Sequence, residues 1–146
     1  MFDGMVPYHH IDVALDEGAF MPERAHDTDA GLDLFARDDF VVPAHGYAFH
    51  DTGVRVQIPH GTDGHVRSKS GLNRDHGITA DGTIDEGYTG PIGVTLHNSG
   101  DEDYLFGRGN KVAQLVIEVI IRPKPRQVAG ISGGERGDNG YGSTGE

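Results

Sequence analysis

The chain has 146 residues, with 12 Lys and Arg against 23 Asp and Glu, no cysteine and 23 glycines. This length fits one domain with its own core, and the absence of cysteine excludes disulfides, thiolate metal sites and cysteine nucleophiles. The formal net charge of −11 argues against a general binder of DNA or RNA, which usually presents a basic face. Because no membrane span or signal peptide is visible, we expect a cytoplasmic protein without a membrane partner, in the host cytoplasm if viral.

Short strands separated by frequent turns are the dominant pattern along the chain. Ile11–Leu15 is the first convincing strand, and apolar residues then alternate with polar ones in Leu32–Ala36, Val54–Ile58 and Ile92–Leu96. Val112–Ile121 is rich in β-branched residues and predicts a longer strand. Glycine- and proline-rich turns recur between these segments, so the sequence predicts an all-β sandwich, jelly roll or barrel.

The last 17 residues, 130–146, contain seven glycines and no aliphatic residue beyond Ile131. Such a segment cannot bury enough apolar surface to fold alone. We therefore expect a β core over residues 1–129 and a mobile arm over residues 130–146. Residues 135–145 combine an arginine, an aromatic ring and a Ser-Thr pair, which could close over a ligand, although a solvated tail has the same composition.

Three further segments carry polar side chains beside glycine. Arg67–Asn73 contains two hydroxyls and two cations that could hold a phosphate, or it is a solvated surface turn. Asp81–Gly90 places three acids and Tyr88 between glycines, which suits a general base or metal ligand but also a soluble hairpin. Asp33 interrupts an apolar strand, where a lone acid usually faces outward. Common hydrolase, zinc-protease and Walker motifs are absent from the sequence.

Taken in order, these segments resemble the five motifs of the trimeric dUTP pyrophosphatase (dUTPase) family. Each motif alone is a weak signal, but five in the right order with strand-like spacers are specific. Together they span residues 30 to 145. In this sequence they are Ala30–Ala36, Lys69–Asn73, Gly82–Gly90, Gly109–Leu115 and Arg136–Gly145.

The resemblance implies a jelly-roll-like all-β subunit with a flexible glycine-rich C-terminal arm that closes over the active site. It also implies a homotrimer with active sites between subunits, and dUTP as the ligand. The implied reaction is Mg²⁺-dependent attack of water on the α-phosphate of dUTP, which yields dUMP and pyrophosphate. By matching positions, Asp85 is the carboxylate that deprotonates the water, and Asp33 holds Mg²⁺ through water.

The same resemblance assigns substrate contacts. Tyr88 would pack under the deoxyribose and leave no room for a 2′-hydroxyl, while Tyr141 would stack on uracil. The residues implied are Gly82, Thr83, Ile84 and Tyr88 for the nucleoside, Lys69, Ser70, Gly71 and Gln114 for the phosphates, and Arg136, Tyr141, Gly142, Ser143 and Thr144 in the arm.

Two departures from the family pattern bear on specificity. Lys69 stands where arginine is usual and offers a point charge instead of a bidentate fork. Thr79 stands where many members carry an asparagine that contacts uracil.

Two alternatives stay open: a dCTP deaminase, alone or bifunctional, with a related fold, and a non-catalytic jelly-roll module that binds a nucleotide. The glycine-rich arm favours the pyrophosphatase.

Overall fold

The computed structural model describes residues 10–142. Over that range the chain forms ten strands, all paired antiparallel, and one short helix, as the all-β prediction requires. In chain order the elements are β1 Val13–Leu15, β2 Leu32–Phe35, β3 Phe40–Val42, β4 Gly46–Asp51, β5 Val54–Val56, β6 Thr62–Arg67, α1 Ser70–His76, β7 Ile78–Ile84, β8 Gly93–Asn98, β9 Tyr104–Phe106 and β10 Lys111–Val119.

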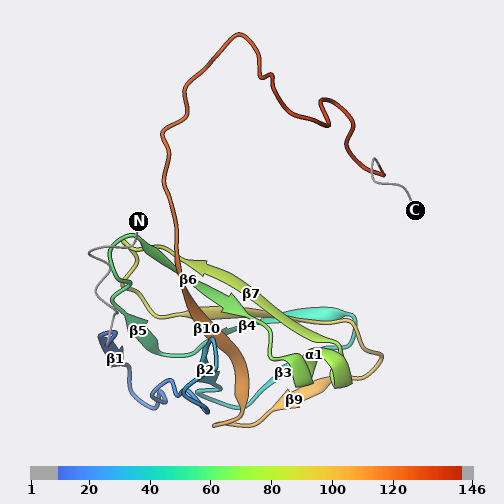
Figure 1. Ribbon diagram of the computed structural model, residues 1–146. Helices are drawn as coiled ribbons and strands as arrows, with labels where there is room; N and C mark the ends of the chain where they lie inside the picture. The colour runs from blue at the N-terminus through green and yellow to red at the C-terminus, as the bar shows by residue number, and fades with distance from the viewer. Residues whose placement is uncertain (1–9, 143–146) are drawn as a thin grey trace.

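Six strands form one curled sheet in the order β2-β10-β6-β7-β8-β4, and β1–β5 and β3–β9 form two smaller sheets (Figure 1). Strand β10 lies between β2 and β6, so Gln114 is opposite Asp33 on one side and Arg67 on the other. Segments that are far apart in the sequence therefore meet at the middle of β10.

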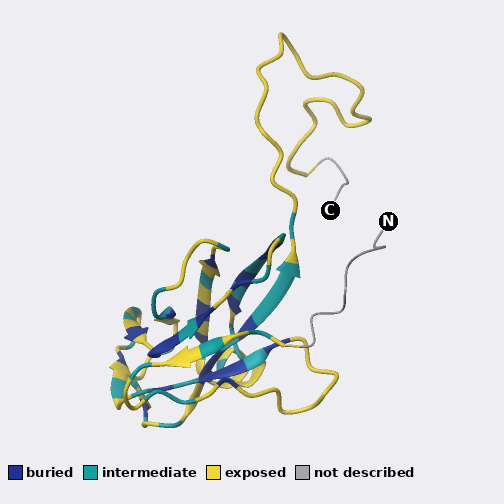
Figure 2. Cartoon of the chain, turned by 90° about the vertical axis from the view of Figure 1, so that its left-hand side faces the viewer, coloured by how far each residue is buried: buried dark blue, intermediate teal, exposed yellow. Residues whose placement is uncertain are grey.

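The two-residue alternation of the strands builds the core. Leu34, Val66, Leu96 and Leu115 are fully buried. Buried and more exposed residues alternate along β6, β7 and β8, and the strands in Figure 2 are banded accordingly. Burial of each such side chain contributes about 1.5–3 kcal/mol relative to exposure. The opposite face of the sheet carries polar and charged residues together with the exposed aromatic side chains of Tyr47 and Phe49 on β4, whereas Ile84 at the end of β7 belongs to the core.

The helix α1 corrects one expectation. The segment from Arg67 to Asn73 was predicted as a turn, but the chain is helical from Ser70. Lys69 is extended before the helix, and Gly77 ends it in the left-handed region with a φ of 67°, a conformation that glycine adopts without strain. A seven-residue helix is too short to produce a readable 3.6-residue period, so the sequence pattern does not reveal it.

The chain leaves the folded body after the last strand. Residues 121–142 contain no strand or helix and are exposed throughout (Figures 1 and 2). Pro123 and Pro125 follow the end of β10, and proline cannot donate a backbone hydrogen bond to a sheet. Ser143 and Thr144 lie outside the described residues. Among those described, no helix has the length and apolar character needed to cross a membrane.

Candidate active site

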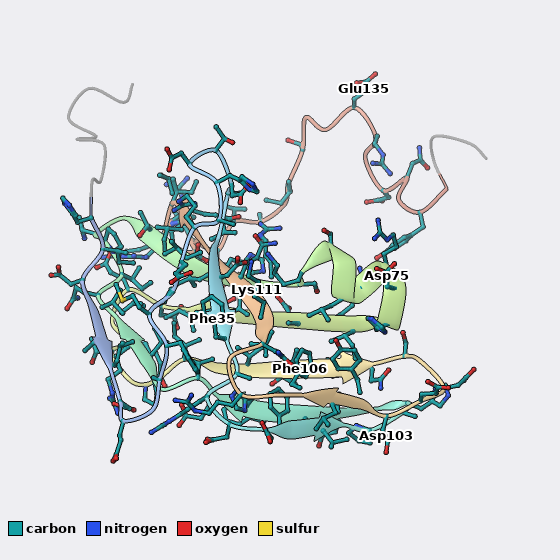
Figure 3. The ribbon with its side chains drawn as sticks, turned by 90° about the horizontal axis from the view of Figure 1, so that it is seen from below. Phe35, Asp75, Asp103, Phe106, Lys111 and Glu135 are labelled. Carbon is teal, nitrogen blue, oxygen red and sulfur yellow. The ribbon has the colours of Figure 1, made fainter. Side chains whose placement is uncertain are left out.

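A buried carboxylate with two lysines lies where β2, β10 and the start of α1 meet. Asp33 is only 4% exposed. Lys69 Nζ lies 2.5 Å from its Oδ1, and Lys111 Nζ lies 3.1 Å from its Oδ2. In Figure 3, Lys111 lies beside Phe35, where β10 and β2 pair. Asp33 interrupts its apolar strand as an acid, but lysines from distant segments cover its carboxylate, so it is not solvated. We call Asp33, Lys69, Lys111 and Gln114 the Asp33 cluster.

The charges of the Asp33 cluster favour an anion. Burial alone would raise the pKa of Asp33, but the hydrogen bonds from Lys69 and Lys111 outweigh burial, so this pKa lies below its ordinary value. The carboxylate is thus ionised at neutral pH. Two ammonium groups against one carboxylate leave one net positive charge, which suits a phosphate group.

The segment that precedes α1 is hydrogen-bonded to the sheet on one side and exposed to solvent on the other. Gln114 Nε2 donates to the carbonyl of Ser68 at 3.0 Å. The Ser68 hydroxyl accepts from the N–H of Ala80 at 2.9 Å and donates to the carbonyl of Ala80 at 3.1 Å. Ser70 and Gly71 are exposed, and a Cβ added at Gly71 would meet nothing within 4 Å. Ser70 and Gly71 therefore offer a hydroxyl and a close backbone approach to a ligand.

A second feature is a pocket of about 260 Å³ at the far end of β7, which we call the Asp85 pocket. Strands β7 and β8 pair only as far as Asp81 opposite Thr95. Beyond that point, residues 82–84 pair with β6 alone, so their other backbone edge faces the gap between β7 and β8. An unpaired backbone edge can hydrogen-bond the polar edge of a ligand. The lining residues are Phe49, Thr83, Ile84, Asp85, Tyr88, Pro91 and Gly93.

Local hydrogen bonds fix the turn that carries Asp85 and Tyr88. The N–H of Tyr88 donates to the carbonyl of Asp85 at 3.0 Å, and the Tyr88 hydroxyl donates to the carbonyl of Pro91 at 2.7 Å. A Cβ at Gly90 would lie 2.6 Å from the Tyr88 hydroxyl oxygen, so the ring rests against a position that only glycine leaves free. The Tyr88 ring is thereby held at the rim, 44% exposed, next to the exposed Asp85.

Glu86 anchors this turn to the rest of the body, a role that the sequence did not indicate. Its carboxylate accepts from the N–H of Gly61 at 2.7 Å and pairs with Arg122 at 2.8 Å, and the ring of His60 lies 3.2 Å away. The hydrogen bonds from Arg122, Gly61 and His60 lower the pKa of Glu86 to about 2. Glu86, the neighbour of Asp85, thus connects the turn after β7 to the start of β6 and to the segment that follows β10.

The lowered pKa of Glu86 predicts an acid-sensitive contribution to stability. This contribution is present above the ordinary pKa of 4.5 and is lost as the pH falls towards 2, because protonation weakens all three interactions. Glu86→Gln should flatten the fall of the urea unfolding midpoint between about pH 5 and pH 3. Glu102→Gln, at an exposed glutamate, is the matched control and should leave the wild-type slope. Parallel curves for Glu86→Gln and wild type would contradict this role of Glu86.

Within one chain, the predicted site residues fall into separate groups. Asp81 pairs with Arg67, which pairs with Gln114, and Asp85 lies four residues after Asp81, just past the end of β7. This spacing separates Asp85 from Gln114 by about 13 Å along the strands and about 10 Å across them. In the arm, Arg136 donates to the carbonyl of Gly140 at 2.7 Å, and Tyr141 is fully exposed. One chain does not bring its predicted phosphate, nucleoside and arm residues together.

The Asp33 cluster and the Asp85 pocket also contain residues that the sequence analysis did not predict. Lys111 pairs with Asp33, while Phe49 and Pro91 line the Asp85 pocket. Lys111 lies inside the fourth motif and could have been chosen for its charge, whereas Phe49 lies outside all five motifs. Thr79 pairs with His97 in the closed part of the β7–β8 ladder. It lies about 20 Å along β7 from Asp85, so it does not line that pocket.

Asp33 also bears on metal binding. Over residues 10–142, no group of three or more His, Cys, Asp or Glu side chains could hold a metal ion. Mg²⁺ is commonly bound through one or two carboxylates together with water and substrate phosphates. Asp33 does not form a cage of protein ligands, and both of its oxygens are paired with lysines. It could therefore contact an ion that arrives with a nucleotide only through water.

Sequence comparison relates this antiparallel β fold, with its anion cluster and nucleoside-sized pocket, to one class of nucleotide hydrolases. The family model described as dUTPase matches residues 17–145. The deoxyuridine 5'-triphosphate nucleotidohydrolase of Clostridium acetobutylicum is 42% identical over 134 residues, which cover 90% of this chain and 92% of the relative. That of Oryza sativa subsp. japonica is 41% identical over 132 residues, or 90% and 77% of the two chains.

Solved structures agree with the sequence comparison. A mutant dUTPase of Staphylococcus bacteriophage 80alpha with dUpNHpp has a TM-score of 0.87 and 31% identity, covering 94% of this chain and 99% of that chain. A mutant dUTPase from phage phi11 of S. aureus, described with a structural Mg(II) ion, has a TM-score of 0.76 and 32% identity, covering 83% and 97%.

The chain belongs to the dUTPase family. It is a dUTP diphosphatase that hydrolyses dUTP to dUMP and pyrophosphate. The family, the jelly-roll-like fold and the reaction predicted from the sequence are confirmed. These findings favour the pyrophosphatase over the deaminase and the non-catalytic alternatives.

Proposed function

We propose that the hydrolysis proceeds by attack of water on the α-phosphate of dUTP, with Asp85 as the general base. The observation that carries this proposal is the Asp85 pocket, which places an exposed carboxylate beside an unpaired backbone edge and an immobilised aromatic ring. A general base must lie within hydrogen-bond reach of the water that it activates. Asp33 and Glu86 are already engaged by cations, whereas Asp85 is exposed at the pocket rim.

The pocket supports recognition of a deoxyuridine moiety. The backbone of Gly82, Thr83 and Ile84 offers donors and acceptors to the edge of uracil. Tyr88 packs under the deoxyribose, and its hydrogen bond to Pro91 together with its contact to Gly90 prevents the ring from moving aside. A 2′-hydroxyl would collide with a ring held in this way, so the pocket selects the deoxy sugar.

Tyr88→Ala should therefore admit UTP. We expect the preference for dUTP over UTP, measured as the ratio of kcat/KM values, to fall by about 10-fold or more. Tyr88→Phe is the matched control, because it keeps the ring and loses only the hydrogen bond to Pro91. It should retain most of the preference. An unchanged preference in Tyr88→Ala would show that sugar selection lies elsewhere.

The Asp33 cluster supports binding of the phosphates. Ser70 offers its hydroxyl and Gly71 its backbone, while Lys69 and Gln114 lie beside them. Phosphoryl transfer depends mainly on positioning and on neutralisation of charge, which lysines supply without covalent chemistry. Bound Mg²⁺ would neutralise further charge on the triphosphate, and Asp33 is the residue that would hold it through water.

The separation of the groups supports a site shared between copies of the chain. A water activated by Asp85 attacks a phosphorus only a few ångströms away. In the same chain Arg67 is opposite Asp81, and Lys69 and Ser70 follow Arg67 in the direction away from Asp85, so they do not hold phosphates beside it. We propose that a second copy supplies its Asp33 cluster and that another supplies its arm, in a homotrimer. There Arg136 binds the γ-phosphate, Tyr141 stacks on uracil beside Gly142, and Ser143 and Thr144 add contacts.

A further inference from the structure

Phe49 is an exposed aromatic residue that none of the five motifs contains. It lies on β4, the edge strand of the six-stranded sheet, and its side chain is 68% exposed. Nevertheless it lines the Asp85 pocket together with Asp85 and Tyr88. A large apolar side chain at the wall of an open pocket that also contains Asp85 suggests a ligand with an apolar surface.

The direction of the Phe49 ring is set by Gly93. In the β4–β8 ladder Phe49 is paired with Thr95, and Asp51 is paired with Gly93. A Cβ at Gly93 would lie 2.1 Å from Cζ and 2.4 Å from Cε2 of Phe49. The ring therefore leans away from its own partner and lies over the backbone of Gly93, towards the pocket. Any other residue at position 93 would displace it.

We propose that Phe49 is a further substrate-binding residue, the apolar wall that contacts the nucleoside part of dUTP opposite Tyr88. This inference rests on the function proposed for the Asp85 pocket. The ring face carries partial negative charge, so it suits a base or a sugar and disfavours a triphosphate. Tyr88, from the turn after β7, and Phe49, from β4, thus lie on two sides of the nucleoside.

The first test is the steady-state kinetics of Phe49→Ala. We expect KM for dUTP to rise about 10-fold, with kcat within about twofold of wild type, because the lost contact is made in the ground state and the transition state alike. Phe49→Leu should restore part of the affinity, and Gly93→Ala should raise KM by displacing the ring. Tyr47→Ala is the matched control: Tyr47 lies two residues away on the same face of β4, is 66% exposed and does not line the pocket.

Product inhibition separates a nucleoside contact from a general defect. In Phe49→Ala, inhibition by dUMP should weaken by the same factor as KM, while inhibition by inorganic pyrophosphate should not change. Wild-type KM and dUMP inhibition in Phe49→Ala would overturn the inference, as would an equal effect of Tyr47→Ala or an equal weakening of pyrophosphate inhibition. If Asp85→Asn is inactive while Phe49→Ala is normal, only this inference fails. If Asp85→Asn keeps wild-type turnover, the proposed function itself fails.

Discussion

Replacing Asp85 with asparagine is expected to lower kcat for dUTP by about 10²- to 10⁴-fold, the usual contribution of a general base. An amide has nearly the shape of a carboxylate but cannot accept the proton of the attacking water. The pocket contacts made by Tyr88 and by the backbone of residues 82–84 remain, so KM should stay within about threefold of wild type. The loss should therefore fall on kcat and not on binding.

Asp81→Asn is the control for the Asp85 variant. Asp81 is an exposed acid on the same strand, but it accepts from the ring of His65 at 3.0 Å in the closed part of the β7–β8 ladder. Its substitution should leave kcat within about twofold of wild type. Stopped-time assays of pyrophosphate release give kcat, and calorimetry with dUpNHpp measures substrate binding separately. Wild-type kcat in Asp85→Asn, or an equal loss in Asp81→Asn, would refute the assignment of the base.

The second large effect is expected from deletion of every residue after Ala129. Residues 121–142 are exposed and contribute no strand, so the shortened chain should fold and unfold thermally like the full chain. Turnover should fall about 100-fold or more, because the arm carries the Arg136 charge and the Tyr141 ring that close over the substrate. The deletion also tests the division into a core of residues 1–129 and an arm of residues 130–146.

Circular dichroism melts and pyrophosphate release distinguish the outcomes of the deletion. Arg136→Ala in the full chain should reproduce part of the lost turnover without changing the melt, which separates the chemistry of the arm from its length. Full activity in the shortened chain would show that the arm takes no part in hydrolysis. A lost melting transition would instead show that residues after Ala129 belong to the core.

Five of the ten strands over residues 10–142, β1, β2, β5, β8 and β10, could be predicted because their apolar pattern is encoded locally, whereas β3, β4, β6, β7 and β9 were not predicted. Alternation at Val54–Val56 and the β-branched run of β10 reflect burial of one sheet face, which a two-residue period reveals directly. The helix α1 could not be found in this way, because it has seven residues and contains Gly71. The exact ends of β10 depend on its partners β2 and β6 and not on its own sequence.

Site residues were predictable where a motif is contiguous and not where it depends on long-range pairing. Asp85 and Tyr88 belong to one contiguous motif, so the resemblance to the family assigns them roles directly, although their spacing alone leaves a soluble hairpin equally open. The burial of Asp33 depends on Lys69 and Lys111, which only the fold brings to it. Phe49 reaches the Asp85 pocket through the pairing of β4 with β8, and no local pattern encodes that contact.

A mixing experiment tests most directly whether the site is shared between chains. One variant carries Asp85→Asn, and the other carries Lys69→Ala with Ser70→Ala, so each lacks a different half of the site. Each variant alone should be nearly inactive. Refolded together in equal amounts, they should recover about a quarter of wild-type turnover, because each half is intact with a probability of about one half and the halves come from different chains. A mixture as inactive as either variant would contradict a shared site.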